Sequence, residues 1–115
     1  MHESEFYTRE AEIISNGLSS AEREVNAVID NYAYLRARLL VGDLSGTPYL
    51  FAIEKAIEEA TLTAEQRTIL DAYLSDMSVT NIARLTGKKK PSIVRTKRRI
   101  VRRLAYHYEA LLTKN

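Results

Sequence analysis

The chain has 115 residues, enough for one compact domain with an ordinary core. It has no cysteine and only two histidines, His2 and His107, so disulfides, a thiolate site and a histidine-rich metal site are excluded and no cofactor is expected. The net charge of +2 hides an asymmetry, because residues 1–60 hold five basic and eleven acidic side chains and residues 61–115 hold twelve and four.

Membrane insertion and enzyme chemistry find little support in the sequence. No apolar run approaches the length of a membrane span, and no basic-then-apolar leader opens the chain, so we expect a cytoplasmic protein. There is no glycine-rich phosphate loop and no Ser-His-Asp set. Glu58 and Glu59 are adjacent, so on a helix they point about 100° apart and cannot face each other as acid and base. We expect no enzyme activity.

The acidic first part of the chain predicts two helices. A short helix is expected over residues 3–15, followed by Asn16-Gly17. Ser19 or Ser20 then caps an amphipathic helix of about twenty residues. Its apolar stripe consists of Val25, Val28, Ile29, Tyr32, Leu35, Leu39 and Leu40.

This stripe has two interpretations. Its spacing suits a coiled-coil seam between two copies. The same face can equally pack within one chain. The homodimer interpretation uses Val25, Ile29, Tyr32, Leu35 and Leu39.

A loop at residues 42–48, rich in glycine and other turn formers, predicts a domain boundary and a hinge between the two parts of the chain. We expect residues 1–47 to form an acidic helical arm for dimerisation or partner binding, and residues 48–115 to form a second domain. Thr47 and Pro48 suggest a cap and a first-turn proline for a helix over residues 48–60. Thr63 and Gln66 form a capping box for a helix ending near residue 75.

Residues 78–104 predict two helices joined by a tight turn. Ser78 can cap the first helix, expected over residues 79–86. Gly87 suits the turn, because glycine takes a left-handed conformation at little cost, and Pro91 suits the first position of the second helix. The second helix has a narrow apolar sector that contains Ile93, Ile100, Val101, Leu104 and Tyr108.

The opposite side of that second helix is strongly basic. Residues 88–103 hold nine basic residues and no acidic one. A bare charge run is usually only a solvated helix face. Here the run coincides with the second helix of a glycine turn, and this combination favours binding to nucleic acid phosphates.

Three segments carry a resemblance to a known family. They are LTAEQRTILDAYL, MSVTNIARLTG and PSIVRTKRRIVRRLA, within residues 62–105. The block resembles region 4 of bacterial sigma-70 factors and phage late-gene regulators of the ArpU and RinA kind. The resemblance implies an all-α fold in which an N-terminal helical arm precedes a sigma region 4-like helix-turn-helix bundle. It also implies a transcription regulator encoded by a phage or prophage.

Three positions depart from the pattern of that family. Sigma-type domains usually have leucine before the turn glycine and an apolar residue after it, whereas this chain has Thr86 and Lys88. Lys97 falls inside the apolar sector, where we expect its stem to be covered while its ammonium group reaches the edge.

The predicted interface divides into two sets of residues. Those expected to reach base edges in the major groove are Ser92, Arg95, Thr96 and Arg99. Those expected to contact phosphates are Arg84, Lys88, Lys89, Lys90, Lys97, Arg98, Arg102 and Arg103. Residues 48–115 are thus expected to form a helix-turn-helix DNA-binding domain, and the expected partner is double-stranded DNA. The alternatives are a sigma-like module that binds RNA polymerase, and the DNA-binding subunit of a phage packaging machine.

Overall fold

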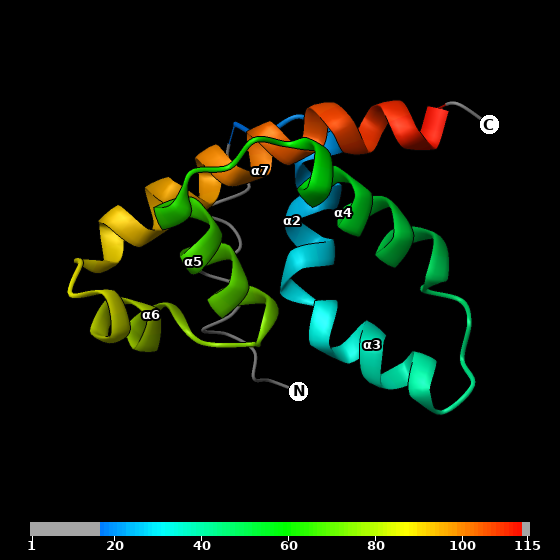
Figure 1. The fold of residues 1–115 in the computed structure, drawn as a ribbon, viewed down its shortest axis with the longest axis horizontal. Coiled ribbons are helices and arrows are strands. Elements are labelled where there is room, and N and C mark those ends of the chain that lie inside the picture. Colours follow the sequence, from blue (N-terminus) through cyan, green and yellow to red (C-terminus); the bar gives the residue numbers. More distant parts are fainter. Residues whose placement is uncertain (1–16, 114–115) are drawn as a thin grey trace.

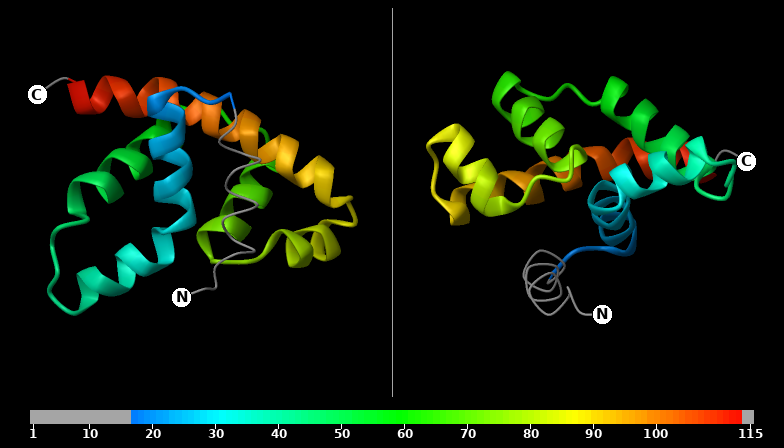
Figure 2. Two further views of the ribbon diagram at one scale, coloured as in Figure 1. Left: turned by 180° about the vertical axis from the view of Figure 1, so that it is seen from behind. Right: turned by 90° about the horizontal axis from the view of Figure 1, so that it is seen from below.

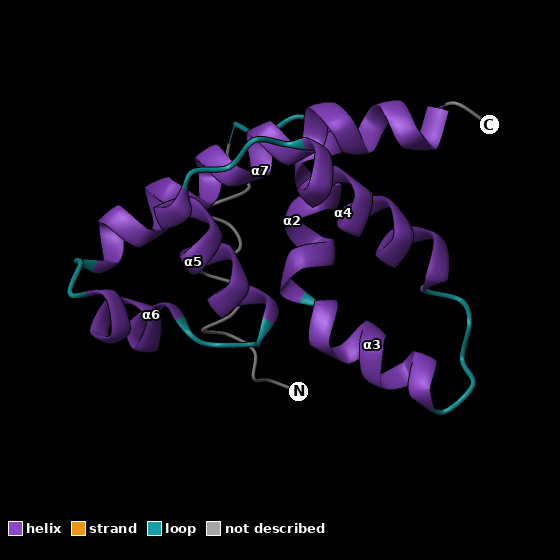
Figure 3. Ribbon diagram, viewed as in Figure 1, coloured by secondary structure: helices purple, strands orange, loops and turns teal. Residues whose placement is uncertain are grey.

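The fold is described from a computed structural model that places residues 17–113 (Figure 1). These residues form six α-helices and no strand (Figure 3), so the all-α prediction is confirmed. The helices are α2 (Ser20–Asp30), α3 (Tyr32–Leu40), α4 (Thr47–Glu59), α5 (Ala64–Leu74), α6 (Val79–Thr86) and α7 (Lys90–Thr113). The helix expected over residues 3–15 lies outside the described residues.

The long helix α7 is the element against which most of the others pack. It has 24 residues, which corresponds to a length of about 36 Å. Helices α2, α4, α5 and α6 all contact it (Figures 1 and 2). The predicted apolar sector is confirmed, since five of its members are almost fully buried. They are Ile93, Ile100, Val101, Leu104 and Tyr108.

Helices begin at caps that the sequence indicates. Ser19 Oγ accepts a hydrogen bond from the Glu22 N–H (3.2 Å), and the Glu22 carboxylate accepts one from the Ser19 N–H (3.0 Å). Thr63 and Gln66 form the same reciprocal pair at the start of α5, and Ser78 caps α6. Each cap typically stabilises its helix by about 1 kcal/mol.

The single helix of about twenty residues expected after Ser19 is instead two helices. Helix α2 ends at Asp30 and α3 begins at Tyr32, with Asn31 between them at φ −108° and ψ 9°. The Asn31 side-chain amide donates to the Ala27 carbonyl (2.7 Å), the local bonding by which asparagine competes with helix continuation. The chain therefore changes direction at Asn31, and α3 runs beside α4 (Figure 1).

The described residues share one core, so the predicted boundary at residue 47 does not separate two units. Val25 and Ile29 of α2 belong to the same buried cluster as Ile53 of α4 and Ile100 of α7. Helix α2 packs on α7 because the apolar stripe of α2 meets the buried apolar sector of α7. Residues 17–47 are consequently part of the body of the protein and not an arm.

The 42–46 loop is ordered by its own side chains. Asp43 accepts hydrogen bonds from the Ser45 N–H (3.1 Å) and hydroxyl (2.7 Å), and it pairs with Arg38 (3.2 Å). These bonds lower the pKa of the Asp43 carboxyl, with the Ser45 hydroxyl as the largest cause. Gly46, not Thr47, is the N-cap of α4, which corrects the predicted cap. The loop joins two packed helices and is not a hinge between domains.

Gly87 takes the left-handed conformation that the sequence predicts, with φ 74°. A Cβ there would meet nothing within 4 Å, so only backbone strain opposes substitution. We expect Gly87→Ala to lower the free energy of unfolding by about 1–2 kcal/mol in urea denaturation.

Asp76 also has a left-handed backbone conformation, with φ 66°, but it carries a side chain, which makes this conformation unfavourable. We expect Asp76→Gly to be neutral or stabilising, and a large loss there would contradict the strain argument.

Candidate nucleic-acid interface

The turn between α6 and α7 is tied by Thr86 and Gly87. The Thr86 hydroxyl donates to the Ile82 carbonyl (2.8 Å), and its oxygen lies 3.3 Å from the Lys88 N–H, which donates to it. The Gly87 N–H donates to the Ala83 carbonyl (2.9 Å). These bonds give threonine a structural role at the position where sigma-type domains usually have leucine. They fix the start of α7 relative to α6.

The four predicted base-reading residues lie in the first half of α7. Arg95 and Arg99 are exposed, and because they are four residues apart they lie on one face of the helix. Ser92 and Thr96 are half-buried beside them. Within residues 17–113, neither arginine forms an ion pair with a carboxylate. This face therefore presents two guanidinium groups that can bind an external acceptor.

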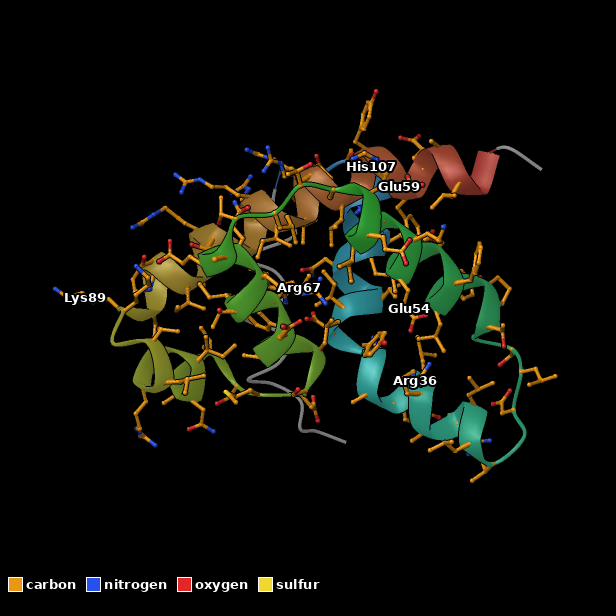
Figure 4. The ribbon with its side chains drawn as sticks, in the orientation of Figure 1. Arg36, Glu54, Glu59, Arg67, Lys89 and His107 are labelled. Atoms are coloured by element: carbon orange, nitrogen blue, oxygen red, sulfur yellow. The ribbon has the colours of Figure 1, made fainter. Side chains whose placement is uncertain are left out.

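Further exposed cations flank this face. Lys89 projects outward at the turn (Figure 4), next to the exposed Lys90. Arg84 on α6 is exposed and donates weakly to Asn81 Oδ1 (3.4 Å). Lys88 is different, because its ammonium group pairs with Glu65 of α5 at 2.5 Å. A phosphate would have to compete with that carboxylate for Lys88.

The second half of the basic face contains a shallow hollow of about 490 Å³. It is lined by Gln66 of α5 and by Arg99, Arg102 and Arg103 of α7. Arg103 donates to the Thr61 carbonyl (2.9 Å), which orients its guanidinium group. No carboxylate lines the hollow, so it is a cationic surface on which an anion would find three arginines.

Lys97, one of the residues predicted to contact phosphates, is enclosed in this structure. Its side chain is 1% exposed and its ammonium group is paired with Asp30 of α2. The same ammonium group lies 4.3 Å from the centre of the Tyr73 ring, a cation–π contact. The cation does not snorkel to the edge of the apolar sector, because α2 supplies a carboxylate inside the interface between α2 and α7.

Arg98 is also less available than the sequence suggests. It is half-buried, and a Cβ on Gly17 would lie only 2.8 Å from its Nη2. The guanidinium group therefore lies against the chain just before α2 and does not stand clear of the surface. Arg98 is a weaker candidate for phosphate contact than Arg102 or Arg103.

The predicted dimer seam is used within the chain. Val25 and Ile29 are fully buried, at 0% and 1% exposure. Tyr32, Leu35 and Leu39 are half-buried on the next helix, where Tyr32 donates a hydrogen bond to Glu54 of α4 (2.7 Å). Val25 and Ile29 therefore pack within the chain, while Tyr32, Leu35 and Leu39 remain partly exposed, and the homodimer through this stripe stays a prediction.

Away from the basic face, the described part of the chain brings His107 of α7 close to Glu59 of α4. His107 lies 3.5 Å from Glu59, and the two side chains approach each other in Figure 4. In the part of the chain that the structure describes, no group of three or more metal-ligating side chains gathers. None of the helices in residues 17–113 combines the length and apolarity needed to cross a bilayer.

Sequence reasoning missed Asp30. It lies 67 residues from Lys97, and nothing around it suggests a partner on α7. The available signal was Lys97 itself, because a lysine inside an apolar helix sector needs a buried anion or a route to solvent.

Comparison of the chain with protein-family models, with curated proteins and with solved structures gives no match.

Proposed function

We propose that the chain is a sequence-specific, double-stranded DNA-binding transcription regulator that reads the major groove with the first half of α7. The observation that carries the proposal is the outer face of this helix. Arg95, Arg99, Arg102 and Arg103 lie on it, and no carboxylate within residues 17–113 pairs with them. Four uncompensated guanidinium groups beside one another favour a polyanion as the partner.

The arrangement of α6 and α7 supports a helix-turn-helix mode of binding. The major groove is about 12 Å wide and admits one α-helix. Arg95 and Arg99 follow the turn closely, where the residues of a recognition helix contact base edges. Each can donate two hydrogen bonds to a guanine, while Ser92 and Thr96 read neighbouring bases.

The cations at the two ends of the basic face suit the two phosphate backbones that border a groove. Lys90 and Arg103 are thirteen residues apart on α7, which corresponds to about 20 Å. A helix lying in the groove would therefore present Lys89 and Lys90 near one strand and Arg102 and Arg103 near the other. Lys97 takes no part in this interface.

The proposed regulatory role rests on the resemblance to sigma-70 region 4. In this resemblance, α6 and α7 of this chain correspond to the two helices of the helix-turn-helix motif.

The proposal is tested by capture of randomly fragmented genomic DNA at about 150 mM salt, a level that suppresses purely electrostatic binding. Enrichment of one short sequence supports the proposal. If no sequence is enriched and the folded protein instead retains RNA polymerase without DNA, the polymerase-binding alternative replaces it.

The phosphate contacts predict a salt dependence. If about five phosphates are neutralised, the plot of log affinity against log salt has a slope of about −4 to −5. Fluorescence anisotropy with a duplex between about 50 and 200 mM salt measures it. Lys89→Ala should reduce the slope by about one unit and weaken all sequences alike.

Lys55→Ala is the matched control for this slope, because Lys55 belongs to α4, pairs with Glu58 and is not part of the basic face of α7. Its slope should equal that of the native protein. A native slope near zero, or an equal change in both variants, would contradict the assignment of the basic face of α7 to phosphates.

A further inference from the structure

Helix α3 has two apolar faces, and only one of them is covered. Tyr32, Leu35 and Leu39 are half-buried on the side of α4. The other side, which we call the outer face of α3, is exposed. At 100° per residue its members occupy an arc of about 120°. They are Ala33, Tyr34, Ala37, Leu40 and the helix-capping Val41.

The exposure of this face is large. Leu40 is 86% exposed, Val41 72% and Tyr34 63%. Single exposed apolar residues are ordinary, but several on one helix face mark an interaction surface. Helix α3 lies at the opposite end of the molecule from the turn between α6 and α7 (Figures 1 and 2). A partner bound here would leave the basic face of α7 open.

The charges around this face are balanced within the chain. Arg36 pairs with Glu54 (3.5 Å; Figure 4) and Arg38 pairs with Asp43 (3.2 Å). These four are the only charged residues in the segment 31–54. A strongly charged partner would find no unpaired opposite charge, and a second copy of this neutral surface would not be repelled.

The spacing of the side chains on the face allows two copies to pair about a two-fold axis. Two α3 helices that cross antiparallel at Ala37 place Tyr34 of one copy opposite Leu40 of the other, and Ala33 opposite Val41. Ala37 meets Ala37 on the two-fold axis, where its small side chain allows the helices to approach closely. We propose that the protein forms a homodimer through this antiparallel pairing of the outer faces of α3.

Sedimentation velocity between about 1 and 500 µM tests the proposal. The native chain should change from monomer to dimer within that range. Ala37→Glu places two carboxylates against each other on the axis and should raise the dissociation constant at least about 100-fold. Ala27→Glu is the matched control, because Ala27 is an exposed alanine on α2 outside the face; it should dimerise like the native chain.

A cross-linking experiment gives a second readout that does not depend on whether the fold tolerates a glutamate at position 37. The chain has no cysteine, so Ala37→Cys introduces a unique thiol. Two cysteines on the axis come within disulfide distance and should give a covalent dimer under mild oxidation, whereas Ala27→Cys should not. A native chain that stays monomeric throughout, or an Ala37→Glu variant that dimerises normally, would overturn the proposal.

Discussion

Replacing both Arg95 and Arg99 by alanine is expected to abolish sequence preference while weaker, nonspecific DNA binding remains. Each guanidinium group is exposed on the outer face of α7. A two-point contact with guanine contributes about 1–3 kcal/mol of discrimination, so each single change should reduce specific affinity by about 5- to 150-fold. Arg102 and Arg103 remain in the double variant and should still attract phosphates.

The measurement compares native and variant proteins on an enriched duplex and on a scrambled duplex of equal length at one salt concentration. Arg67→Ala is the matched control, because Arg67 is exposed but pairs with Asp71 (2.9 Å) and borders a different hollow. It should bind like the native protein. If the double variant lost affinity for both duplexes equally, Arg95 and Arg99 would be phosphate contacts, and base reading would have to come from other residues.

Local features of this fold were predictable because local chemistry determines them. The Thr63 and Gln66 pair and the turn at Gly87 depend on residues within one or two helical turns of each other. The buried stripe of α7, including Ile93 and Leu104, follows from helical periodicity. The exposed positions of Arg95 and Arg99 follow from the same periodicity read on the opposite side.

The features that were not predicted depend on which face meets which helix. The apolar stripe through α2 and α3 looks continuous, but the change of direction at Asn31 divides it between two partners. Val25 and Ile29 enter the core with α7, while Leu35 lies near Gly46 at the start of α4. Periodicity identifies an apolar face but not its partner, which is why a seam between copies remained a competing interpretation.

The pairing of Asp30 with Lys97 predicts an asymmetric effect on stability. Asp30→Asn leaves the ammonium group of Lys97, 1% exposed, without its anion. We expect a loss of about 3 kcal/mol in the free energy of unfolding, a large part of the 5–15 kcal/mol typical of small domains. Lys97→Met leaves only Asp30, whose side chain is 32% exposed and accessible to water, and should cost much less.

Urea denaturation of the two single variants and the double variant tests this asymmetry. The double variant should be more stable than Asp30→Asn alone, because the unpaired buried charge is gone. Asp71→Asn, which breaks the exposed pair with Arg67, is the control and should cost at most about 1 kcal/mol. Equal losses in both single variants would mean that Lys97 reaches water in solution.

The Lys97→Met and Asp30→Asn variants also test whether Lys97 has a structural role or contacts DNA. Because the Lys97 ammonium group is enclosed between α2, α7 and the Tyr73 ring, Lys97→Met should keep both the DNA affinity and the salt slope of the native protein. A slope reduced by about one unit would instead mean that Lys97 leaves Asp30 to reach a phosphate on binding. Packing of α2 on α7 would then change when DNA binds, and Asp30→Asn would strengthen binding by freeing the cation.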